Sequence, residues 1–242
     1  WGGCGTIMTD ITLKLENLHT YYGLVHMLRG VSLELAKGEL VGILGRNGAG
    51  KTTTIKTIMG LAPPREGKVI LNGEDIAGFP PHLAAQRGLA YVPASRGIFA
   101  TLSAYENLSI FQKKNATWTA ERVFDMFPRL AAMKSRGGTQ LSGGEQQMLA
   151  IGRTLVTDPS VILLDEPSQG LAPKIVDLVV EMLETLMKEG ISIILVEQNL
   201  QLALDVSQRV YILDHGEVVF HGKGSDLKDD PELTVTYLGV SA

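Results

Sequence analysis

The chain has 242 residues, a formal net charge of −4, one cysteine, 45% apolar residues and 20% charged residues. This length fits one large or two small domains with a substantial core, and the composition excludes a mainly disordered chain. The single cysteine excludes a disulfide framework and a multi-cysteine metal site, and the acidic balance disfavours a protein that binds nucleic acid by bulk charge.

The predicted elements follow one another as short apolar runs and amphipathic stretches. Residues 1–7 show no periodicity, and we expect a leader or a cloning remnant there, with Met8 as the natural start. Strands are expected at 11–18, 31–35, 40–44, 68–72, 89–92, 161–164, 191–196, 209–213 and 218–221. Helices are expected at 51–59, 145–155, 175–188 and 231–238, and most of 102–157 has a helical pattern.

The order of these elements indicates the fold class. Strand–loop–helix followed by strand–helix–strand is typical of a parallel sheet covered by helices, and the turn DHGE at 214–217 adds a hairpin. We therefore predict an α/β fold with a mixed sheet core, as one domain over residues 8–242 with an inserted helical subdomain at about 94–155. No apolar run reaches the ~18 residues that a membrane-spanning helix needs.

A glycine-rich loop with the sequence GRNGAGKT occupies residues 45–52 and matches the pattern G-x-x-x-x-G-K-[ST]. Its glycines let backbone N–H groups point inward around phosphate oxygens, and the helix that follows adds its N-terminal dipole. We expect Lys51 to reach the β- and γ-phosphates and the Thr52 hydroxyl to bind Mg²⁺. A turn without ligand is the alternative, which the position between an apolar strand and a helix disfavours. The residues predicted to contact nucleotide are Gly45, Asn47, Gly48, Ala49, Gly50, Lys51, Thr52 and Thr53.

Two carboxylates, Asp165 and Glu166, end the apolar run at 161–164. Adjacent strand residues point to opposite sides, so the two acids have different tasks. We expect Asp165 to hold Mg²⁺ through water, and Glu166 to orient or deprotonate the attacking water as a catalytic residue. Alone, such a pair is more often a solvated strand end, but the phosphate loop upstream reverses that preference.

Residues 141–147 read LSGGEQQ and open the helix expected at 145–155. With the phosphate loop and the run VILLDEPS at 161–168, this segment resembles the ATP-binding-cassette ATPases, whose signature it matches, and the resemblance covers residues 11–237. It implies a P-loop NTPase that binds ATP and Mg²⁺ and hydrolyses ATP. It also implies a head-to-tail dimer in which the phosphate loop of one subunit and the signature of the other enclose each ATP. Ser142, Gly143 and Gly144 would donate hydrogen bonds to the γ-phosphate across that interface.

An aromatic residue before the phosphate loop matches another part of the family's nucleotide site. Tyr22 precedes Gly23 and resembles the aromatic residue that stacks on adenine in this family. Tyr21 is a rival for that place, and a tyrosine that fills the core at a strand end is the alternative reading. Stacking of this kind contributes about 1–3 kcal/mol and tolerates any base.

Three positions depart from the pattern of the superfamily. Ala94 stands where a glutamine that contacts Mg²⁺ is usual, Gln198 where a histidine contacts the γ-phosphate, and Ala172 where an aspartate is common. The Ala94 methyl group neither binds a metal nor orients water, whereas Gln198 still donates a hydrogen bond to phosphate. We hypothesise altered hydrolysis at this chain's own site and best function beside a different ATPase subunit. Vigorous ATPase activity of the purified chain, unchanged by any partner, would contradict this hypothesis.

Three longer runs resemble one branch of the family more closely. They are LSGGEQQMLAIGR at 141–153, EPSQGLAP at 166–173 and LVEQN at 195–199. The branch is the second ATPase subunit of branched-chain amino-acid importers, to which urea and amide importers are related. It implies integral-membrane permease subunits, a second ATP-binding-cassette subunit (as a heterodimer, or a homodimer in isolation) and, indirectly, a periplasmic binding protein. It also implies no nucleic acid and a peripheral location on the cytoplasmic face of the inner membrane.

The permease contact is expected on the loop 93–100 and the helix 103–112. The apolar side chains that form this contact, or fill the helical subdomain instead, are Ile98, Phe99, Leu102, Leu108 and Phe111. A soluble ABC ATPase acting on DNA or ribosomes is disfavoured, because such proteins usually have coiled-coil insertions or two cassettes. The signature disfavours a small-molecule kinase. The ATPase of a lipid exporter would share the coupling mechanism and differ in cargo.

Overall fold

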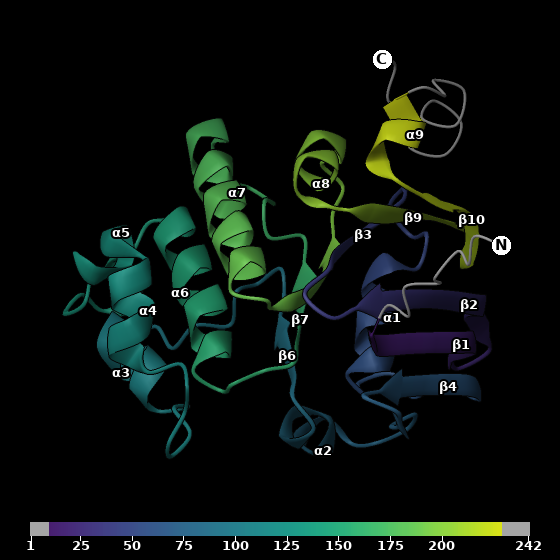
Figure 1. Ribbon diagram of the computed structural model, residues 1–242, viewed down its shortest axis with the longest axis horizontal. Coiled ribbons are helices and arrows are strands. Elements are labelled where there is room, and N and C mark those ends of the chain that lie inside the picture. Colours follow the sequence, from purple (N-terminus) through teal and green to yellow (C-terminus); the bar gives the residue numbers. More distant parts are fainter. Residues whose placement is uncertain (1–9, 229–242) are drawn as a thin grey trace, which may run out of the picture.

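The computed structural model describes residues 10–228, so the expected leader at 1–7 and the expected helix at 231–238 lie outside the described residues. The strands are β1 (Ile11–Tyr22), β2 (Val25–Ala36), β3 (Leu40–Leu44), β4 (Glu66–Leu71), β5 (Glu74–Asp75), β6 (Leu89–Val92), β7 (Val161–Asp165), β8 (Ser192–Val196), β9 (Arg209–Asp214) and β10 (Glu217–Gly222). The helices are α1 (Lys51–Ile58), α2 (Pro81–Gln86), α3 (Ala104–Ser109), α4 (Ala120–Met126), α5 (Pro128–Ala131), α6 (Gly143–Leu155), α7 (Pro173–Lys188), α8 (Leu200–Val206) and α9 (Gly224–Lys228), with a short 3-10 turn at Gly138–Gln140. Figure 1 shows α3–α7 on one side of the molecule and β1, β2 and β4 on the other.

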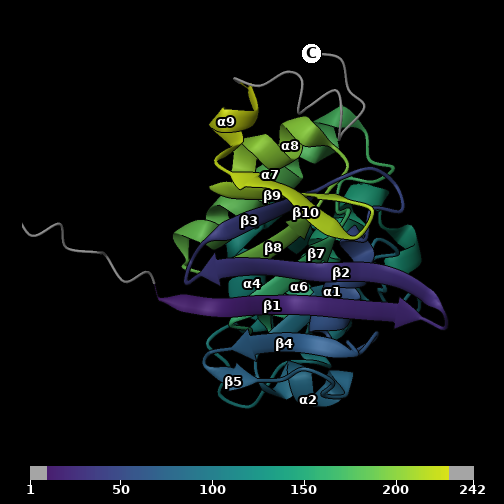
Figure 2. The same ribbon diagram turned by 90° about the vertical axis from the view of Figure 1, so that its right-hand side faces the viewer.

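Two sheets share an apolar core with α1. The first is antiparallel with the strand order β2-β1-β4-β5, and Figure 2 shows these strands in that order. The second has the order β10-β9-β3-β8-β7-β6, and its strands pair in parallel except for the β9–β10 hairpin. Side chains of both sheets and of α1 pack in one buried cluster. The helix that follows the phosphate loop is thus held between two sheets.

The central strands of the six-stranded sheet are buried on both faces. Every residue of β3, β7 and β8 is buried, which fits the apolar runs 40–44, 161–164 and 193–196. Residues of α6 and α7 pack on the face away from α1, together with residues of α3, α4 and α5, in a second buried cluster. The carboxyl ends of the parallel strands meet at one edge, so the loops after β3, β7 and β8 lie together there.

The predicted α/β fold with a mixed sheet is confirmed. The pattern does not specify the separate antiparallel sheet, because alternation shows which face of a strand is buried and not which strand it pairs with. Pro81 begins α2, although Pro80 and Pro81 favour a loop in the sequence, because proline suits the first helical position. None of the helices within residues 10–228 has the length and apolarity needed to cross a bilayer.

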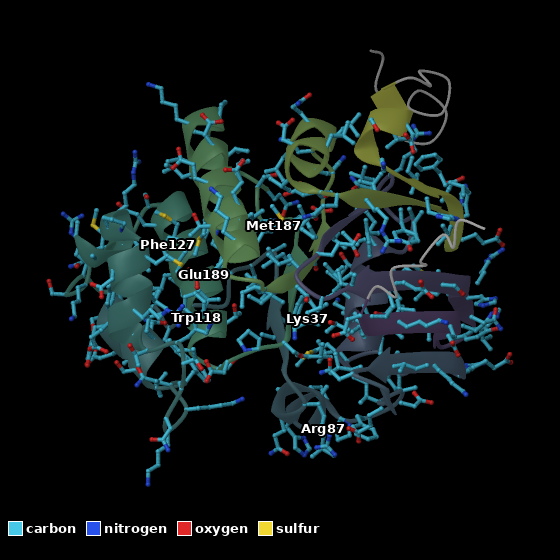
Figure 3. The ribbon with its side chains drawn as sticks, viewed as in Figure 1. Lys37, Arg87, Trp118, Phe127, Met187 and Glu189 are labelled. Atoms are coloured by element: carbon cyan, nitrogen blue, oxygen red, sulfur yellow. The ribbon has the colours of Figure 1, made fainter. Side chains whose placement is uncertain are left out.

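A polar contact joins α4, in the helical subdomain, to the C-terminal end of α7. Arg122 Nη2 donates to Glu189 Oε2 at 2.7 Å, and the Arg122 guanidinium lies 4.0 Å from the centre of the Trp118 ring. Figure 3 labels Trp118 and Glu189, which lie near one another on the left of the molecule. Ser103 and Glu106 form a capping box at the start of α3.

Candidate active site

The phosphate loop (residues 45–52) connects β3 to α1. Gly45 and Gly50 have φ angles of 150° and 111°, which favour glycine. A Cβ atom at Gly45 would lie 2.3 Å from the carbonyl oxygen of Leu213, so no larger residue fits. Gly50 is the N-cap of α1, and no side chain caps this helix. The first N–H groups of α1 are therefore donors suited to phosphate oxygens.

Lys51 is the first residue of α1, and its side chain is buried. Its Nζ donates to the carbonyl oxygens of Gly45 at 2.9 Å and Arg46 at 3.3 Å. The same Nζ lies 3.7 Å from Glu166 Oε1. These contacts hold the ammonium group over the loop and next to the acidic end of β7. The structure thus brings together two residues that the sequence separates by more than one hundred positions.

Asp165 joins the phosphate loop to β7 and β6. Its Oδ1 accepts a hydrogen bond from Thr52 Oγ1 at 2.9 Å, and its Oδ2 accepts one from the Tyr91 hydroxyl at 3.1 Å. Burial, and then the nearby Asp165 carboxylate, raise the pKa of Tyr91 far above its usual value, so the hydroxyl stays a donor. A hydroxyl and a carboxylate oxygen in hydrogen-bond contact are the ligand types that Mg²⁺ prefers, with phosphate oxygens and water completing the octahedron. The pair of Thr52 and Asp165 therefore fits Mg²⁺.

Glu166 has a strained backbone. Its φ is 47°, a left-handed conformation that is uncommon for residues other than glycine, and its N–H donates to the carbonyl oxygen of Val196 at 2.8 Å. Such strain persists where surrounding structure enforces it, and it is enriched at functional sites. Glu166 also lines a cavity of about 280 Å³ together with Gln198. The structure places both residues at one site, and their catalytic roles remain predictions.

Glu197 is a buried acid that the sequence reasoning missed. Its carboxylate accepts backbone N–H groups from Ser168 at 2.9 Å, Gln198 at 3.1 Å and Asn199 at 3.2 Å. Burial raises the pKa of Glu197, although these N–H donors lower it. The carboxylate therefore ties the loop after Glu166 to the segment that carries Gln198. An acid directly after the apolar run 193–196 is the signal in the sequence that could have found it.

Tyr22 ends β1 at an exposed position. Its rival Tyr21 stacks on the His26 ring at 4.1 Å, and the Arg65 guanidinium lies 4.1 Å from the centre of the Tyr21 ring. Tyr21 therefore already has partners for its ring, whereas Tyr22 is 45% exposed. The hydroxyls of Thr20 and Thr57 lie 2.9 Å apart and hold this end of β1 against α1. This arrangement favours Tyr22 as the residue that stacks on adenine, which remains a prediction.

The signature segment (residues 141–147) begins α6 with a capping box. Ser142 Oγ accepts from the Glu145 N–H at 3.4 Å, and the Ser142 N–H donates to Glu145 Oε2 at 2.7 Å. Gly144 is buried against α7, where a Cβ atom would lie 2.1 Å from Ile175 Cγ2. Figure 1 shows α6 and α1 on opposite sides of the six-stranded sheet. The structure therefore does not bring Ser142, Gly143 and Gly144 to the phosphate loop of the same chain.

The three departures from the superfamily pattern lie near this site. Ala94 follows β6 and is partly buried, so only a methyl group occupies that position. Ala172 is the exposed N-cap of α7 and makes no side-chain cap. Gln198 is exposed at the cavity that Glu166 also lines. Within β6, three positions before Ala94, the Tyr91 hydroxyl is a polar group at this edge of the sheet and contacts Asp165.

A groove of about 550 Å³ separates β6 and α2 from the helical subdomain. Phe99 and Phe111 line it and stack on each other with ring centres 5.8 Å apart. Leu108, in contrast, is fully buried in the core, so of the two possibilities left open by the sequence it fills the helical subdomain and offers no surface to a permease. Its position on the inner face of the short helix α3 explains the difference, because only the opposite face is open to a partner.

Cations line this groove. Arg96, Lys113 and Arg153 face it, and within residues 10–228 no carboxylate does. Arg153 Nη2 donates to the carbonyl oxygen of Gly97 at 2.7 Å, whereas its Nη1 is buried and has no partner in the described part of the chain. The guanidinium lies 5.3 Å and 5.4 Å from the two phenylalanine rings of the groove. Burial lowers the pKa of Arg153, which reflects an incompletely compensated charge.

Known proteins resemble this chain over most of its length. The family profile for ABC transporters matches residues 28–169. The high-affinity branched-chain amino acid transport ATP-binding protein BraG of Pseudomonas aeruginosa is 39% identical, covering 94% of this chain and 99% of BraG. The probable branched-chain amino acid transport ATP-binding protein LivF of Archaeoglobus fulgidus is 36% identical, with 94% and 99% covered. The lipopolysaccharide export system ATP-binding protein LptB of Escherichia coli is 35% identical, with 94% and 97% covered.

Solved structures share the fold as well. A nucleotide-free ATP-binding cassette from an ABC transporter has a TM-score of 0.80 and 26% identity, over 93% of this chain and 97% of that chain. A dimeric bacterial ABC transporter cassette has a TM-score of 0.75 and 28% identity, over 87% and 98%. The segment that the family profile matches contains the phosphate loop, the signature segment and the two acids that end β7.

Proposed function

The chain belongs to the ABC transporter family of ATP-binding proteins, and we propose that it powers a branched-chain amino-acid importer. It is an ABC-type ATPase. The observation that carries the catalytic part of the proposal is the meeting of Lys51, Thr52, Asp165 and Glu166 at one edge of the sheet. The likeness to BraG and LivF supports the choice of cargo.

Hydrolysis follows from the tasks of these residues. Lys51 and the N–H groups at the start of α1 bind the phosphates and spread their charge. Glu166 accepts a proton from water while the water oxygen attacks the γ-phosphorus, and the bond from that phosphorus to the β,γ-bridging oxygen breaks to release ADP. Gln198 donates a hydrogen bond to the γ-phosphate from across the cavity it shares with Glu166. Thr52 and Asp165 would hold Mg²⁺, which would neutralise part of the negative charge of the phosphates.

The signature segment completes a site on another subunit. Within one chain it lies across the sheet from the phosphate loop, so its donors other than the Ser142 N–H, which donates to Glu145, would meet an ATP that a partner holds. A likeness to a dimeric cassette supports this arrangement. Because Ala94, Ala172 and Gln198 remove polar or titratable groups, we propose that this chain works best beside a different ATPase subunit.

The groove between β6 and the helical subdomain is the surface we propose for the permease. An amphipathic permease helix fits it, because Phe99 and Phe111 offer apolar contact and Arg153 offers an uncompensated charge. The chemistry of the groove calls for a carboxylate on that helix. Docking there would hold the chain at the cytoplasmic face of the membrane, with a periplasmic binding protein acting through the permease.

Two steps test this function. A tagged chain is purified from membranes solubilised in mild detergent, and its partners are identified by mass spectrometry. We expect two permeases and a second ATPase, and Arg153→Met should lower their recovery while Lys37→Met, far from the groove, should not. The complex in proteoliposomes should then take up labelled leucine only with ATP and the binding protein. Recovery of no membrane protein would contradict the proposal.

A lipid exporter is the second candidate, because LptB is 35% identical to this chain. It shares the ATPase chemistry and differs in the membrane partner. The same proteoliposomes decide between the two. ATP-dependent release of lipopolysaccharide without leucine uptake supports the exporter, and uptake of urea or an amide in place of leucine supports a related importer.

A further inference from the structure

Tyr91 contacts two regions of the molecule, the groove and the metal-binding acid. Tyr91 is one of the residues that line the 550 Å³ groove, and its hydroxyl donates to Asp165 Oδ2 at 3.1 Å. The strand register explains this reach. Tyr91 pairs with Leu163 in the parallel β6–β7 ladder, so it points to the same face of the sheet as Leu163 and Asp165, two positions apart on β7.

The carboxylate of Asp165 is held from two sides. Thr52 donates to one oxygen and Tyr91 to the other. If Thr52 served as a ligand of Mg²⁺, Tyr91 would remain as a donor that fixes the rotation of the Asp165 carboxylate. Ala94, which follows β6, has no polar side-chain atom with which to share this task.

We propose that Tyr91 is a positioning residue that orients Asp165 for Mg²⁺ and makes this orientation respond to whatever fills the groove. The groove lining and the hydrogen bond belong to one residue, whose side chain has two rotatable angles. A displacement of the ring by a groove occupant therefore displaces the hydroxyl and changes its bond to Asp165. In this chain, occupation of the groove therefore changes the orientation of the Asp165 carboxylate through the Tyr91 side chain.

The first test measures binding without turnover. Calorimetry on a Glu166→Gln background gives the affinity for ATP with Mg²⁺ and with EDTA. Tyr91→Phe should weaken binding of Mg·ATP roughly tenfold, as expected for loss of a hydrogen bond to a charged group, and leave binding in EDTA unchanged. Tyr211→Phe is the matched control, because it removes a buried hydroxyl that accepts from the Glu34 N–H at 3.2 Å, away from Asp165. Equal Mg·ATP affinity of Tyr91→Phe and its parent would overturn the proposal.

Rescue separates positioning from general damage. Ala94→Gln supplies an amide near the same edge, so the double variant Tyr91→Phe/Ala94→Gln should regain most of the lost Mg·ATP affinity. Thermal unfolding of each variant shows whether the fold is intact. A double variant with no recovery, although its melting temperature equals that of the parent, would count against the assignment.

The second test fills the groove. Ala85 is an exposed residue of α2 that lines it, and Ala85→Trp places a large side chain there. We expect this change to shift Mg·ATP affinity several-fold when Tyr91 is present and not when Tyr91 is phenylalanine. The same shift in both backgrounds, or no shift in either, would contradict the proposed link between the groove and Asp165. Only the identity of the natural occupant of the groove rests on the proposed function. Both tests use the chain alone, so they can be interpreted even if the importer proposal fails.

Discussion

The phosphate loop and the signature segment of this ATPase each lead into a helix, and these two helices start in opposite ways. α1 begins at Gly50 without a side-chain cap, whereas α6 begins at Ser142 with a complete capping box. In α6 the pair of Ser142 and Glu145 satisfies local backbone groups, and in α1 the corresponding N–H groups are left for a ligand. We therefore call the phosphate loop the receiving site, because its N–H groups need a ligand. We call the signature segment the preformed surface, because its own capping box satisfies the start of its helix.

The two regions also differ in how they are assembled. The phosphate-loop site joins Thr52 to Asp165 across 113 positions, and Lys51 to Glu166. The signature segment depends on contacts within one turn of helix and on the packing of Gly144 against Ile175. Substitutions in the first region should change binding or turnover, and substitutions in the second should first change stability.

Glu166→Gln should give the largest effect and separates turnover from binding. The amide keeps the size of the side chain and cannot take the proton from water, so ATP hydrolysis should fall about 10²–10⁴-fold. ATP affinity, measured by calorimetry, should stay close to that of the parent. Glu181→Gln on the exposed side of α7 is the control and should leave hydrolysis unchanged. Full turnover of Glu166→Gln would remove Glu166 from the mechanism.

Lys51→Ala should give the next largest effect, on binding. Loss of a buried ammonium group that serves phosphate should weaken ATP affinity roughly 10²-fold. Lys56→Ala, later on the same helix, is the control. If both variants bound ATP as tightly as the parent, the phosphate loop would not be the receiving site.

Gly144→Ala tests the preformed surface by stability. The new Cβ atom meets Ile175 Cγ2, and such overpacking destabilises by about 1–3 kcal/mol. In a chain of this size that lowers the melting temperature by roughly 2–12 °C. Gly143→Ala is the matched control, since its nearest neighbours lie 3.4 Å from the new atom. Adding Ile175→Ala should recover part of the loss; no difference between the two glycine variants would refute the packing argument.

Ser142→Ala should give the smallest effect. Removal of the α6 cap destabilises by ~1 kcal/mol, or roughly 2–4 °C in melting temperature. Ser95→Ala, at an exposed position, should change the melting temperature less. Identical melting temperatures for the two variants would mean that the cap contributes nothing, and the contrast between α6 and α1 would lose its basis.

The sequence predicts the elements that carry strong local patterns. The expected strands at 40–44 and 89–92 coincide with β3 and β6, and the fully buried runs of β7 and β8 are found within a residue of their expected bounds. The phosphate loop and the capping box of Ser103 are local patterns of the same kind. These features depend on neighbours in the chain, so the sequence alone contains them.

The features that the sequence does not predict are those that depend on contacts between distant segments of the chain. Tyr91 reads as one more apolar strand residue until β6 is known to lie beside β7, which places its hydroxyl at Asp165. Glu197 gains its role only because the loop containing Ser168 comes back to it. The sequence leaves open whether Leu108 contacts a permease or fills the helical subdomain, and the packing of α3 against α6 buries it. Each case depends on which elements meet, which local patterns do not report.

The central claim is that a receiving site on one chain and a preformed surface on another enclose ATP between them. Light scattering on the Glu166→Gln chain, with and without Mg·ATP, tests it most directly. We predict that the mass doubles only with Mg·ATP, and that Gly143→Asp, which adds negative charge where the γ-phosphate of the partner's ATP would lie, keeps the chain monomeric while calorimetry shows ATP still bound. A chain that binds ATP and stays monomeric without the Gly143→Asp change, or a dimer that survives it, would contradict the account.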